Sequence, residues 1–302
     1  MASWGELRGR GEHALRLVRA SSPVAEAQWI LEAASGMDGA ELIAATAEPV
    51  PRTVEHRVEK MLARRCAGEP LQYVLQSWSF RGLDLLVDPR VLIPRPETET
   101  TVQVAIDEAE RFGARVGRRN PWVGTETAYP VADLGTGSGA IALALVSELP
   151  DAEVWATDVS EDALVVARAN LAGAGSIATR VRVAGGSWFD ALPESLVGEL
   201  RLVVSNPPYV AADEVVDLPP EVALHEPREA LVSGPTGLEA IETIVATAPR
   251  WLAPRLGVLV VEVAPHQGSR AVGMAHDAGF AAAFTRPDMA GRDRVLVARM
   301  AG

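Results

Sequence analysis

The chain has 302 residues, 48% of them hydrophobic, and a formal net charge of −12 at pH 7. This length is sufficient for one large domain or two smaller ones, and the acidic balance provides no electrostatic footprint for a long nucleic-acid duplex, which argues against DNA as the substrate. Because no apolar run approaches the roughly 20 residues of a membrane span, and the N-terminus lacks the apolar region of a secretory signal, we expect a cytoplasmic protein without membrane contact.

Residues 1–70 show the spacing of helices throughout. Ser22 followed by Pro23 is typical of a helix start, and Gly36 is typical of a helix end. A second apolar stripe at helical spacing follows. The only cysteine, Cys66, has no other cysteine with which to form a disulfide, and no cluster of cysteine and histidine predicts a metal site. We expect a small helical domain that presents a surface to a partner.

A β-hairpin is predicted next. Residues 71–75 and 78–80 are rich in strand-forming side chains, Arg81-Gly82 supplies a turn, and residues 83–87 form the returning strand. We expect residues 71–96 to link the helical domain to the rest of the chain.

The main domain is expected over residues 97–302. Prolines hold the segment before it extended, and a helix is predicted from residue 97 to about 112. Residues 113–129 are polar and without periodicity, which indicates a long loop or a partly ordered insertion.

The strongest local signal is a glycine loop between a short strand at residues 130–134 and an apolar helix at residues 140–149. The loop is Gly135-Thr136-Gly137-Ser138-Gly139, and its glycines allow a tight turn that leaves N–H groups of the helix N-terminus facing a ligand. The next strand, residues 153–157, ends in Asp158, whose carboxylate suits ribose hydroxyls. The unit indicates a nucleoside cofactor. Because it also satisfies the relaxed dinucleotide fingerprint, a nicotinamide-dependent oxidoreductase remains an alternative.

Strands and helices continue to alternate toward the C-terminus. The predicted elements are a helix at 162–172, strands at 179–183 and 200–204, a long loop at 211–235, a helix at 237–252, a strand at 257–263 and a helix at 267–278. Trp188 suits a core position and a contact with a purine equally well. The last two strands, residues 280–285 and 294–300, are joined by too few residues for a crossover helix and are therefore antiparallel. By analogy of fold, this ending is typical of S-adenosylmethionine methyltransferases rather than of nicotinamide-binding folds.

A second motif, Ser205-Asn206-Pro207-Pro208-Tyr209, follows the strand at residues 200–204. Two successive prolines donate no N–H to a ladder, so the strand ends there. Asn206 then lies at the carboxyl end of the strand, the edge at which open α/β sheets bind ligands. The Asn206 amide and the Pro207 carbonyl suit a planar NH2 group, and Tyr209 provides a surface on which such a group stacks.

With the glycine loop, Asp158 and the motif at Asn206 in this order, the chain resembles the class I S-adenosylmethionine-dependent methyltransferases of planar NH2 groups. Three further segments extend the resemblance over nearly the whole chain: Ile93-Pro94-Arg95-Pro96-Glu97-Thr98-Glu99, Glu226-Pro227 and Gly291-Arg292-Asp293-Arg294. With the helical N-terminal domain, they make the chain similar to the peptide-chain release factor glutamine methyltransferases of the PrmC/HemK type. The resemblance implies a Rossmann-like α/β fold with a seven-stranded, mostly parallel sheet, an antiparallel last strand, an N-terminal helical bundle and a linking hairpin.

The resemblance also implies an activity and a site. The activity is transfer of a methyl group from S-adenosylmethionine, which leaves S-adenosylhomocysteine, to the glutamine amide of the Gly-Gly-Gln motif in class 1 release factors. The implied cofactor-binding residues are Gly135, Thr136, Gly137, Ser138, Gly139, Asp158, Trp188 and Asn206. The implied catalytic residues are Asn206, Pro207 and Tyr209, which with Pro208 bind the substrate. The helical domain, residues 1–70, would help to dock the release factor.

The sequence departs from the family pattern at Ser187, where an acid usually precedes the tryptophan; the insertion at 113–129 is also long. An amide nitrogen is a poor nucleophile, but a sulfonium is a good leaving group, so we expect orientation rather than a strong base to drive the reaction. An adenine-N6 methyltransferase of DNA or RNA shares the NH2 site and remains an alternative, although it should carry a basic track.

Overall fold

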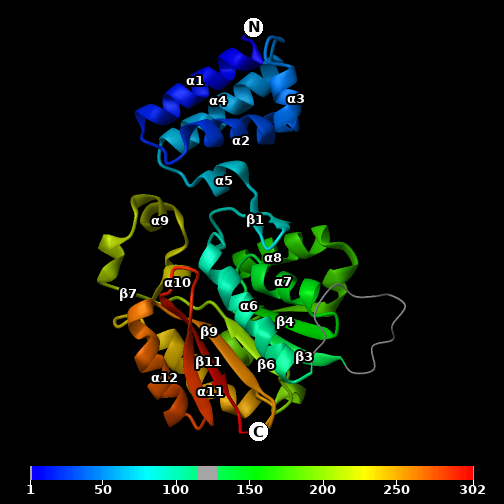
Figure 1. Ribbon diagram of the computed structural model, residues 1–302, viewed down its shortest axis with the longest axis vertical. Helices are drawn as coiled ribbons and strands as arrows, with labels where there is room; N and C mark the ends of the chain where they lie inside the picture. Colours follow the sequence, from blue (N-terminus) through cyan, green and yellow to red (C-terminus); the bar gives the residue numbers. More distant parts are fainter. Residues whose placement is uncertain (1, 114–127, 302) are drawn as a thin grey trace. The chain divides into compact units, whose positions relative to one another are not determined.

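The structure is a computed structural model in which residues 2–113 and 128–301 are described (Figure 1). The chain divides into two compact units, one formed by Met1–Ser77 with Pro219–His225 and the other by Trp78–Leu218 with Glu226–Gly302. None of the helices in the described ranges has the length and apolar character needed to cross a membrane. The predicted insertion falls almost entirely on residues 114–127, which lie outside the described residues.

The first unit is helical, as the spacing predicted. Its elements are α1 (Trp4–Leu17), α2 (Pro23–Ser35), α3 (Gly39–Ala44), α4 (Arg52–Cys66), α5 (Leu71–Leu75) and α9 (Pro220–His225). Leu7, Ile30 and Val58 are buried in its core. The α2 helix starts at Pro23 and ends before Gly36, whose φ of 77° lies in the left-handed region that favours glycine.

The prediction of a strand at residues 71–75 is wrong, because this segment forms the short helix α5 (Leu71–Leu75). The carbonyl of Pro70 accepts hydrogen bonds from the N–H groups of Tyr73 and Val74, which closes a helical turn. The strand-forming side chains of α5 are explained by burial: Leu71, Tyr73 and Val74 are all buried. Their preference for packing therefore overrides their preference for strands.

The hairpin itself is confirmed. The β1 strand (Trp78–Phe80) pairs antiparallel with β2 (Leu83–Leu85). The two residues between them, Arg81 and Gly82, both have positive φ, at 47° and 74°. This is the backbone geometry that a tight two-residue hairpin requires.

The second unit is built on a seven-stranded sheet with the strand order β10-β11-β9-β6-β3-β4-β5. The strands are β3 (Tyr129–Leu134), β4 (Ala152–Asp158), β5 (Val181–Gly185), β6 (Leu202–Ser205), β9 (Val258–Glu262), β10 (Ala282–Pro287) and β11 (Asp293–Arg299). Strands β3, β4, β5, β6 and β9 are parallel, and β11 is antiparallel to both of its neighbours. The predicted fold class and the antiparallel final strand are confirmed.

Helices cover both faces of the sheet (Figure 1). One face packs against α6 (Pro96–Arg111), α7 (Ala140–Glu148) and the end of α8 (Glu161–Gly173); the other packs against α11 (Glu239–Trp251) and α12 (Gly268–Asp277). Successive residues of the central strands alternate between the two cores, since Val204 contributes to the first and Val203 to the second. The parallel strands therefore bring their carboxyl ends to one edge, where the predicted motifs follow them.

The prediction of a long loop at residues 211–235 is largely wrong, because most of this segment forms short helices and strands. It contains a two-strand pair of β7 (Val210–Ala211) and β8 (Val232–Gly234), the helices α9 and α10 (Arg228–Leu231), and a 3₁₀ turn at Glu214–Asp217. Further 3₁₀ turns occupy Gly175–Arg180, Trp188–Ala191, Glu194–Leu196 and Pro265–Gln267, and the first of them delays β5 by two residues relative to its expected start. Elements of one turn are too short to show periodicity, and the prolines that start them resemble loop residues.

Asn170 on α8 holds the segment after the hairpin against the glycine loop. Its Oδ1 accepts a hydrogen bond from the Leu86 N–H at 2.7 Å, and its Nδ2 donates to the carbonyls of Leu86 at 3.0 Å and Ser138 at 2.8 Å. The side chain is buried. One amide therefore satisfies three backbone groups that would otherwise be buried without partners.

Replacing Asn170 by alanine should lower the free energy of unfolding by about 2 to 4 kcal/mol, because buried polar groups lose their partners. Urea-induced unfolding measures the change. Gln103→Ala, which removes an exposed amide from α6, is the control and should cost about 0.5 kcal/mol or less. Equal losses in the two variants would contradict this role of Asn170.

Candidate active site

A pocket at the carboxyl edge of the sheet brings most of the predicted residues together. Its walls come from the glycine loop, the ends of β4, β5 and β6, and the segments at residues 90–98 and 227–230. Gly135, Thr136, Gly137, Ser138, Asp158, Trp188, Asn206 and Pro208 all line it. Of the other predicted residues, Gly139 is the N-cap of α7, and Pro207 and Tyr209 lie directly beside the lining residues in the chain.

The glycine loop adopts backbone conformations that other residues rarely reach. Gly135, Gly137 and Gly139 have φ values of 72°, 54° and 83°. A Cβ atom on Gly135 would lie 3.3 Å from Cζ3 of Trp188, so the backbone packs closely against that ring. The loop thus exposes main chain rather than side chains to the pocket, as binding of a nucleoside cofactor requires.

A buried carboxylate, which the sequence analysis missed, supports the loop from within the fold. Asp133, at 0% exposure, accepts hydrogen bonds on Oδ2 from the Thr136 hydroxyl at 2.6 Å and the Ala142 N–H at 3.1 Å. Burial raises the pKa of Asp133 to about 7, and the charge of Asp158 adds to the increase, while the two hydrogen bonds oppose it. An aspartate one residue before the end of a buried strand is the signal that could have identified it.

Asp158 ends β4 and lies beside the glycine loop. Its Oδ2 accepts a hydrogen bond from the Gly137 N–H at 2.8 Å, and its Oδ1 accepts one from the Ser160 N–H at 2.9 Å. Burial raises the pKa of Asp158, and these backbone hydrogen bonds oppose the increase. Each carboxylate oxygen has a second lone pair, so Asp158 can accept further hydrogen bonds from ligand hydroxyls.

Trp188 lies between the pocket and the hydrophobic core. Its ring lines the pocket and also packs against the core between the sheet, α11 and α12. Its φ of 47° is unusual for a residue with a side chain, and its carbonyl accepts a hydrogen bond from the Thr157 hydroxyl at 3.3 Å. Ser187 lines the same pocket, as does an exposed acid, Glu229, which the sequence analysis did not single out.

The nitrogen and the oxygen of the Asn206 amide differ in their hydrogen bonding. Its Nδ2 donates a hydrogen bond to the hydroxyl of Thr98 at 3.0 Å. Its Oδ1 is buried and has no hydrogen-bond partner among the residues that the structure describes. Because Asn206 lines the pocket, the site offers a hydrogen-bond acceptor to a ligand that carries an N–H group.

Tyr209 is held mainly by packing. Its side chain is half-buried against the core, and its carbonyl accepts a hydrogen bond from Nε2 of Gln267 at 2.9 Å. Burial raises the pKa of the Tyr209 hydroxyl to about 12, and the charge of Glu262 contributes. The hydroxyl is therefore neutral at physiological pH. It can support a ligand but is unsuited to act as a base.

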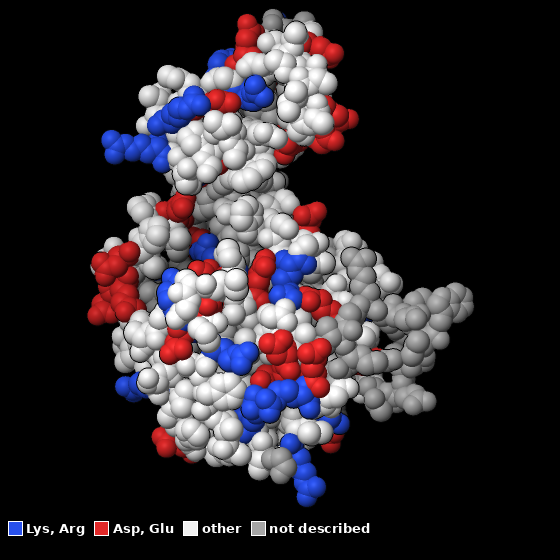
Figure 2. Space-filling model, in the orientation of Figure 1, with Lys and Arg blue, Asp and Glu red and all other residues white. Residues whose placement is uncertain are grey.

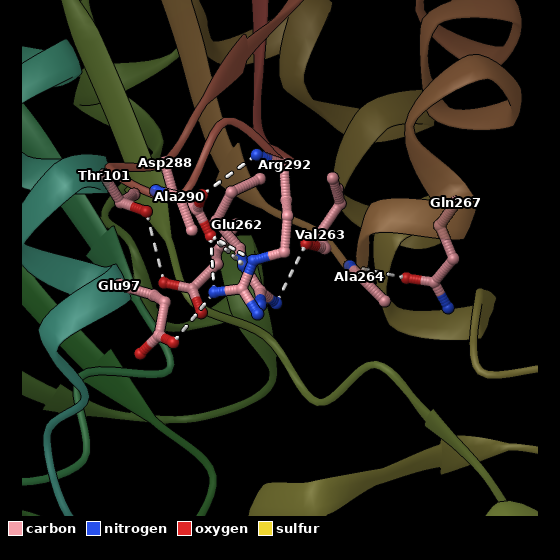
Figure 3. A network of polar contacts seen from close by, with 10 residues as sticks. Glu97, Thr101, Glu262, Val263, Ala264, Gln267, Asp288, Ala290 and Arg292 are labelled. Atoms are coloured by element: carbon pink, nitrogen blue, oxygen red, sulfur yellow. Dashed lines mark hydrogen bonds and ion pairs between the residues drawn. The ribbon is translucent and has the colours of Figure 1, made fainter.

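A polar network to which the sequence analysis gave no role lies at the end of β9 (Figure 3). Glu262, at 0% exposure, accepts a hydrogen bond from the Thr101 hydroxyl at 3.1 Å. Arg292 links Asp288, at 2.7 Å, with Glu97 on α6, at 3.3 Å. Glu262 could have been identified from the sequence, because it is an acid at the carboxyl end of a buried valine-rich strand. No sequence pattern indicated that residues of α6 would contact it.

Two segments singled out by the sequence also meet here. Glu226 is buried and accepts hydrogen bonds from the guanidinium of Arg95 and the N–H of Ile93. The turn before α6 and the turn before α10 are thereby joined next to the pocket. In the described parts of the chain, no group of three or more His, Cys, Asp or Glu side chains is placed to hold a metal ion.

Comparisons with known proteins find relatives over most of the chain. The PrmC N-terminal domain matches residues 6–75, and the methyltransferase small domain matches residues 123–237. The chain is 40% identical to a release factor glutamine methyltransferase of Gloeobacter violaceus, over 90% of this chain and 89% of that protein. It is 41% identical to one of Streptomyces coelicolor, over 81% of each chain.

Solved structures show the same fold at greater distance. The N-terminal domain of human METTL16 in complex with SAH aligns with a TM-score of 0.52 and 16% identity, over 78% of this chain and 83% of that one. At this identity, the likeness concerns the fold alone.

The buried carboxyl of Asp133 should make stability fall as pH rises. Its pKa in the folded state, about 7 against an ordinary 3.8, favours the protonated form. The stabilisation is complete below about pH 4 and lost by about pH 7, at no more than about 1.4 kcal/mol per pH unit. Asp133→Asn should lack this component, as urea unfolding between pH 5 and 8 can measure.

The exposed residue Asp84 provides the control for this titration. Asp84→Asn should retain the pH dependence of the wild type. If Asp133→Asn retained it too, the assignment to Asp133 would be wrong.

Proposed function

The chain belongs to the release factor glutamine methyltransferases, and on this premise we propose that its pocket methylates the side-chain amide nitrogen of the glutamine in the Gly-Gly-Gln motif of class 1 release factors. The methyl donor is S-adenosylmethionine, which supplies a methyl group on a sulfonium, a very good leaving group. The observation that carries the proposal is the unpaired Oδ1 of Asn206 in a pocket shared with the glycine loop.

The residues present fit this donor. The glycine loop leaves its main chain open to the pocket, and an added Cβ on Gly135 would press against Trp188. We assign the methionine and ribose parts to the loop formed by Gly135, Thr136, Gly137, Ser138 and Gly139. Asp158 would accept the ribose hydroxyls, and Trp188 would contact the adenine, with Asn206 lining the same pocket.

The substrate amide would be held by acceptors rather than by charges. The Oδ1 of Asn206 and the carbonyl of Pro207 accept one N–H each from the glutamine NH2 group, while Pro208 and Tyr209 pack beside it. With both hydrogens fixed, the nitrogen lone pair is directed to one side of the amide plane. Orientation of this kind contributes up to roughly 7 to 11 kcal/mol in well-aligned reactions. No side chain has to remove a proton before transfer, which agrees with the neutral Tyr209. The N–CH3 bond forms as the S–CH3 bond breaks and S-adenosylhomocysteine leaves, and the methylated nitrogen then releases one proton to solvent.

We further propose that residues 1–70 form the domain that docks the release factor, that residues 71–96 link it, and that residues 97–302 carry out the transfer. The match of the PrmC N-terminal domain to residues 6–75 supports a separate role for this region. A release-factor substrate implies that the reaction occurs in the cytoplasm, where ribosomes terminate translation.

The two alternatives are not favoured. Membership of the family leaves no role for a nicotinamide cofactor. An adenine-N6 methyltransferase would share the NH2 site, but the net charge of −12 and the interspersed acidic and basic side chains on the face shown in Figure 2 give no support for a nucleic-acid track. We therefore propose no direct contact with nucleic acid.

The decisive experiment is methyl transfer from labelled S-adenosylmethionine to a purified class 1 release factor. The same factor with its Gly-Gly-Gln glutamine changed to alanine is the matched control, and unmethylated DNA is a second substrate. Label should enter the intact factor alone. Label on the altered factor would place the methyl group on another residue, and label on DNA alone would overturn the proposal.

Replacing Asn206 by alanine should lower kcat by roughly 100-fold or more, because the substrate amide loses one of its two acceptors. The affinity for S-adenosylhomocysteine, measured by calorimetry, should change by less than about threefold, since the glycine loop and Asp158 remain. Equal losses in turnover and in cofactor affinity would argue against Asn206 as the residue that holds the substrate.

A further inference from the structure

We propose that Thr98, supported by Glu262, is a positioning residue that fixes the orientation of the Asn206 amide, so that the amide oxygen and not the NH2 group faces the substrate. The inference rests on the proposed function, because it explains how the acceptor at Asn206 is kept available. It concerns two buried residues to which the sequence analysis gave no role.

The three side chains meet because two neighbouring strands end together. Ser205 of β6 pairs with Val261 of β9, so Asn206 and Glu262 follow at the same level of the sheet edge. The first turn of α6 brings Thr98 to the same place. Thr98 is 4% exposed and Glu262 is 0% exposed, so neither exchanges its partners freely with water.

The direction of the hydrogen bonds follows from the number of protons available. An ionised carboxylate only accepts hydrogen bonds, whereas a hydroxyl has one proton to donate and lone pairs to accept. Thr98 lies close enough to Glu262 to lower the pKa of that carboxyl. Oε1 of Glu262 is buried and has no hydrogen-bond partner among the described residues, so we infer that the Thr98 proton is directed at this oxygen. The lone pairs of Thr98 then accept from Nδ2 of Asn206, at 3.0 Å. With one N–H of Asn206 held by Thr98, the amide has a fixed orientation, and its Oδ1 remains an acceptor without a partner among the described residues.

The direction of these hydrogen bonds depends on the protonation state of Glu262, which the surrounding groups influence. Burial raises its pKa, and Glu97 on α6 adds to the increase, while Thr98, Arg294 on β11 and Thr101 oppose it. Tyr209 also faces Glu262, since the charge of the carboxylate raises the pKa of the tyrosine. Arg294 is the nearby cation that favours the ionised form, and it is itself largely buried.

Removing the charge at position 262 would allow the hydrogen bonds to reverse. A protonated carboxyl or a glutamine can donate to the Thr98 oxygen, which frees the Thr98 proton to point at Oδ1 of Asn206. The acceptor needed by the substrate would then be occupied. The Asn206 amide would instead present its NH2 group to another NH2 group, which cannot hydrogen-bond productively.

The first test compares Thr98→Val, Thr98→Ser and Thr101→Val in the methyl-transfer assay. Thr98→Val keeps the shape but loses the hydroxyl, and kcat should fall roughly 10- to 100-fold with the affinity for S-adenosylhomocysteine unchanged. Thr98→Ser restores the hydroxyl and should recover kcat to within about threefold of the wild type. Thr101→Val removes a hydroxyl from Glu262 but not from Asn206, and should cost far less than Thr98→Val. Equal losses at 98 and 101, or no rescue by serine, would overturn the inference.

A second test uses the pH profile of kcat. In the wild type, activity should fall on the acid side as Glu262 becomes protonated, at a pH above the ordinary range of a glutamate because burial raises its pKa. Glu262→Gln should remain at the low kcat of the acid side at every pH and therefore lack this acid limb. An unchanged acid limb in Glu262→Gln would contradict the proposed role of the charge.

A third test does not depend on activity. The chain contains three asparagines, Asn120, Asn170 and Asn206, so 15N-labelled asparagine gives three side-chain NH2 signals that Asn206→Ala can assign. Thr98→Val should speed hydrogen exchange of the Asn206 NH2 roughly tenfold or more, while Thr101→Val leaves it slow. Unchanged exchange in Thr98→Val would refute the positioning role even if release-factor methylation were demonstrated. Altered exchange without any methyl transfer would instead support the positioning and refute the proposed function.

Discussion

The end of β6 is the constraint on which the site depends. Ser205 is still paired with both neighbouring strands, but Pro207 and Pro208 cannot donate to a ladder, so the chain leaves the sheet immediately after Asn206. A buried strand thereby delivers a polar amide to the carboxyl edge with little freedom to move. Because the strand is fixed on both sides, the free acceptor of Asn206 is placed by the core rather than by a flexible loop.

At the carboxyl edge of the sheet, the residues proposed to bind the cofactor and those proposed to bind the substrate come from different strands. Strands β3 and β4 contribute the glycine loop and Asp158, which are tied to each other by the hydrogen bond from Gly137. Strand β6 leads to Asn206, which lines the pocket, and the neighbouring strand β9 ends at the same level in the buried Glu262. In the proposed function, the donor and the acceptor of the methyl group would thus be held by adjacent pairs of strands in one sheet. Relative orientation, the main requirement for an unreactive amide nucleophile, then follows from the register of the sheet.

The sequence predicted those parts of the fold whose signals are local. A valine-rich run before two prolines, glycines between a strand and a helix, and a two-residue hairpin turn each specify backbone geometry within a few residues. The α5 helix was mistaken for a strand because burial, a tertiary effect, selected its side chains. The bond between Thr98 and Asn206 joins residues 108 positions apart in the chain. Such a contact depends on how α6 packs on the sheet, which no local pattern encodes.

The charged residues near Asn206 are placed so that the site can bind the NH2 group of the proposed substrate without removing a proton from it. A carboxylate in direct contact with the substrate amide would hold an N–H strongly but would also bring an uncompensated charge into a buried pocket. Here the charge of Glu262 is set one hydroxyl away, behind Thr98, and Arg294 lies among its neighbours. In the proposed arrangement, only neutral acceptors need to meet the NH2 group, and the carboxyl of Glu262 fixes the orientation of Asn206 through Thr98. The buried carboxylate therefore contributes polarity to the site without becoming a base in it.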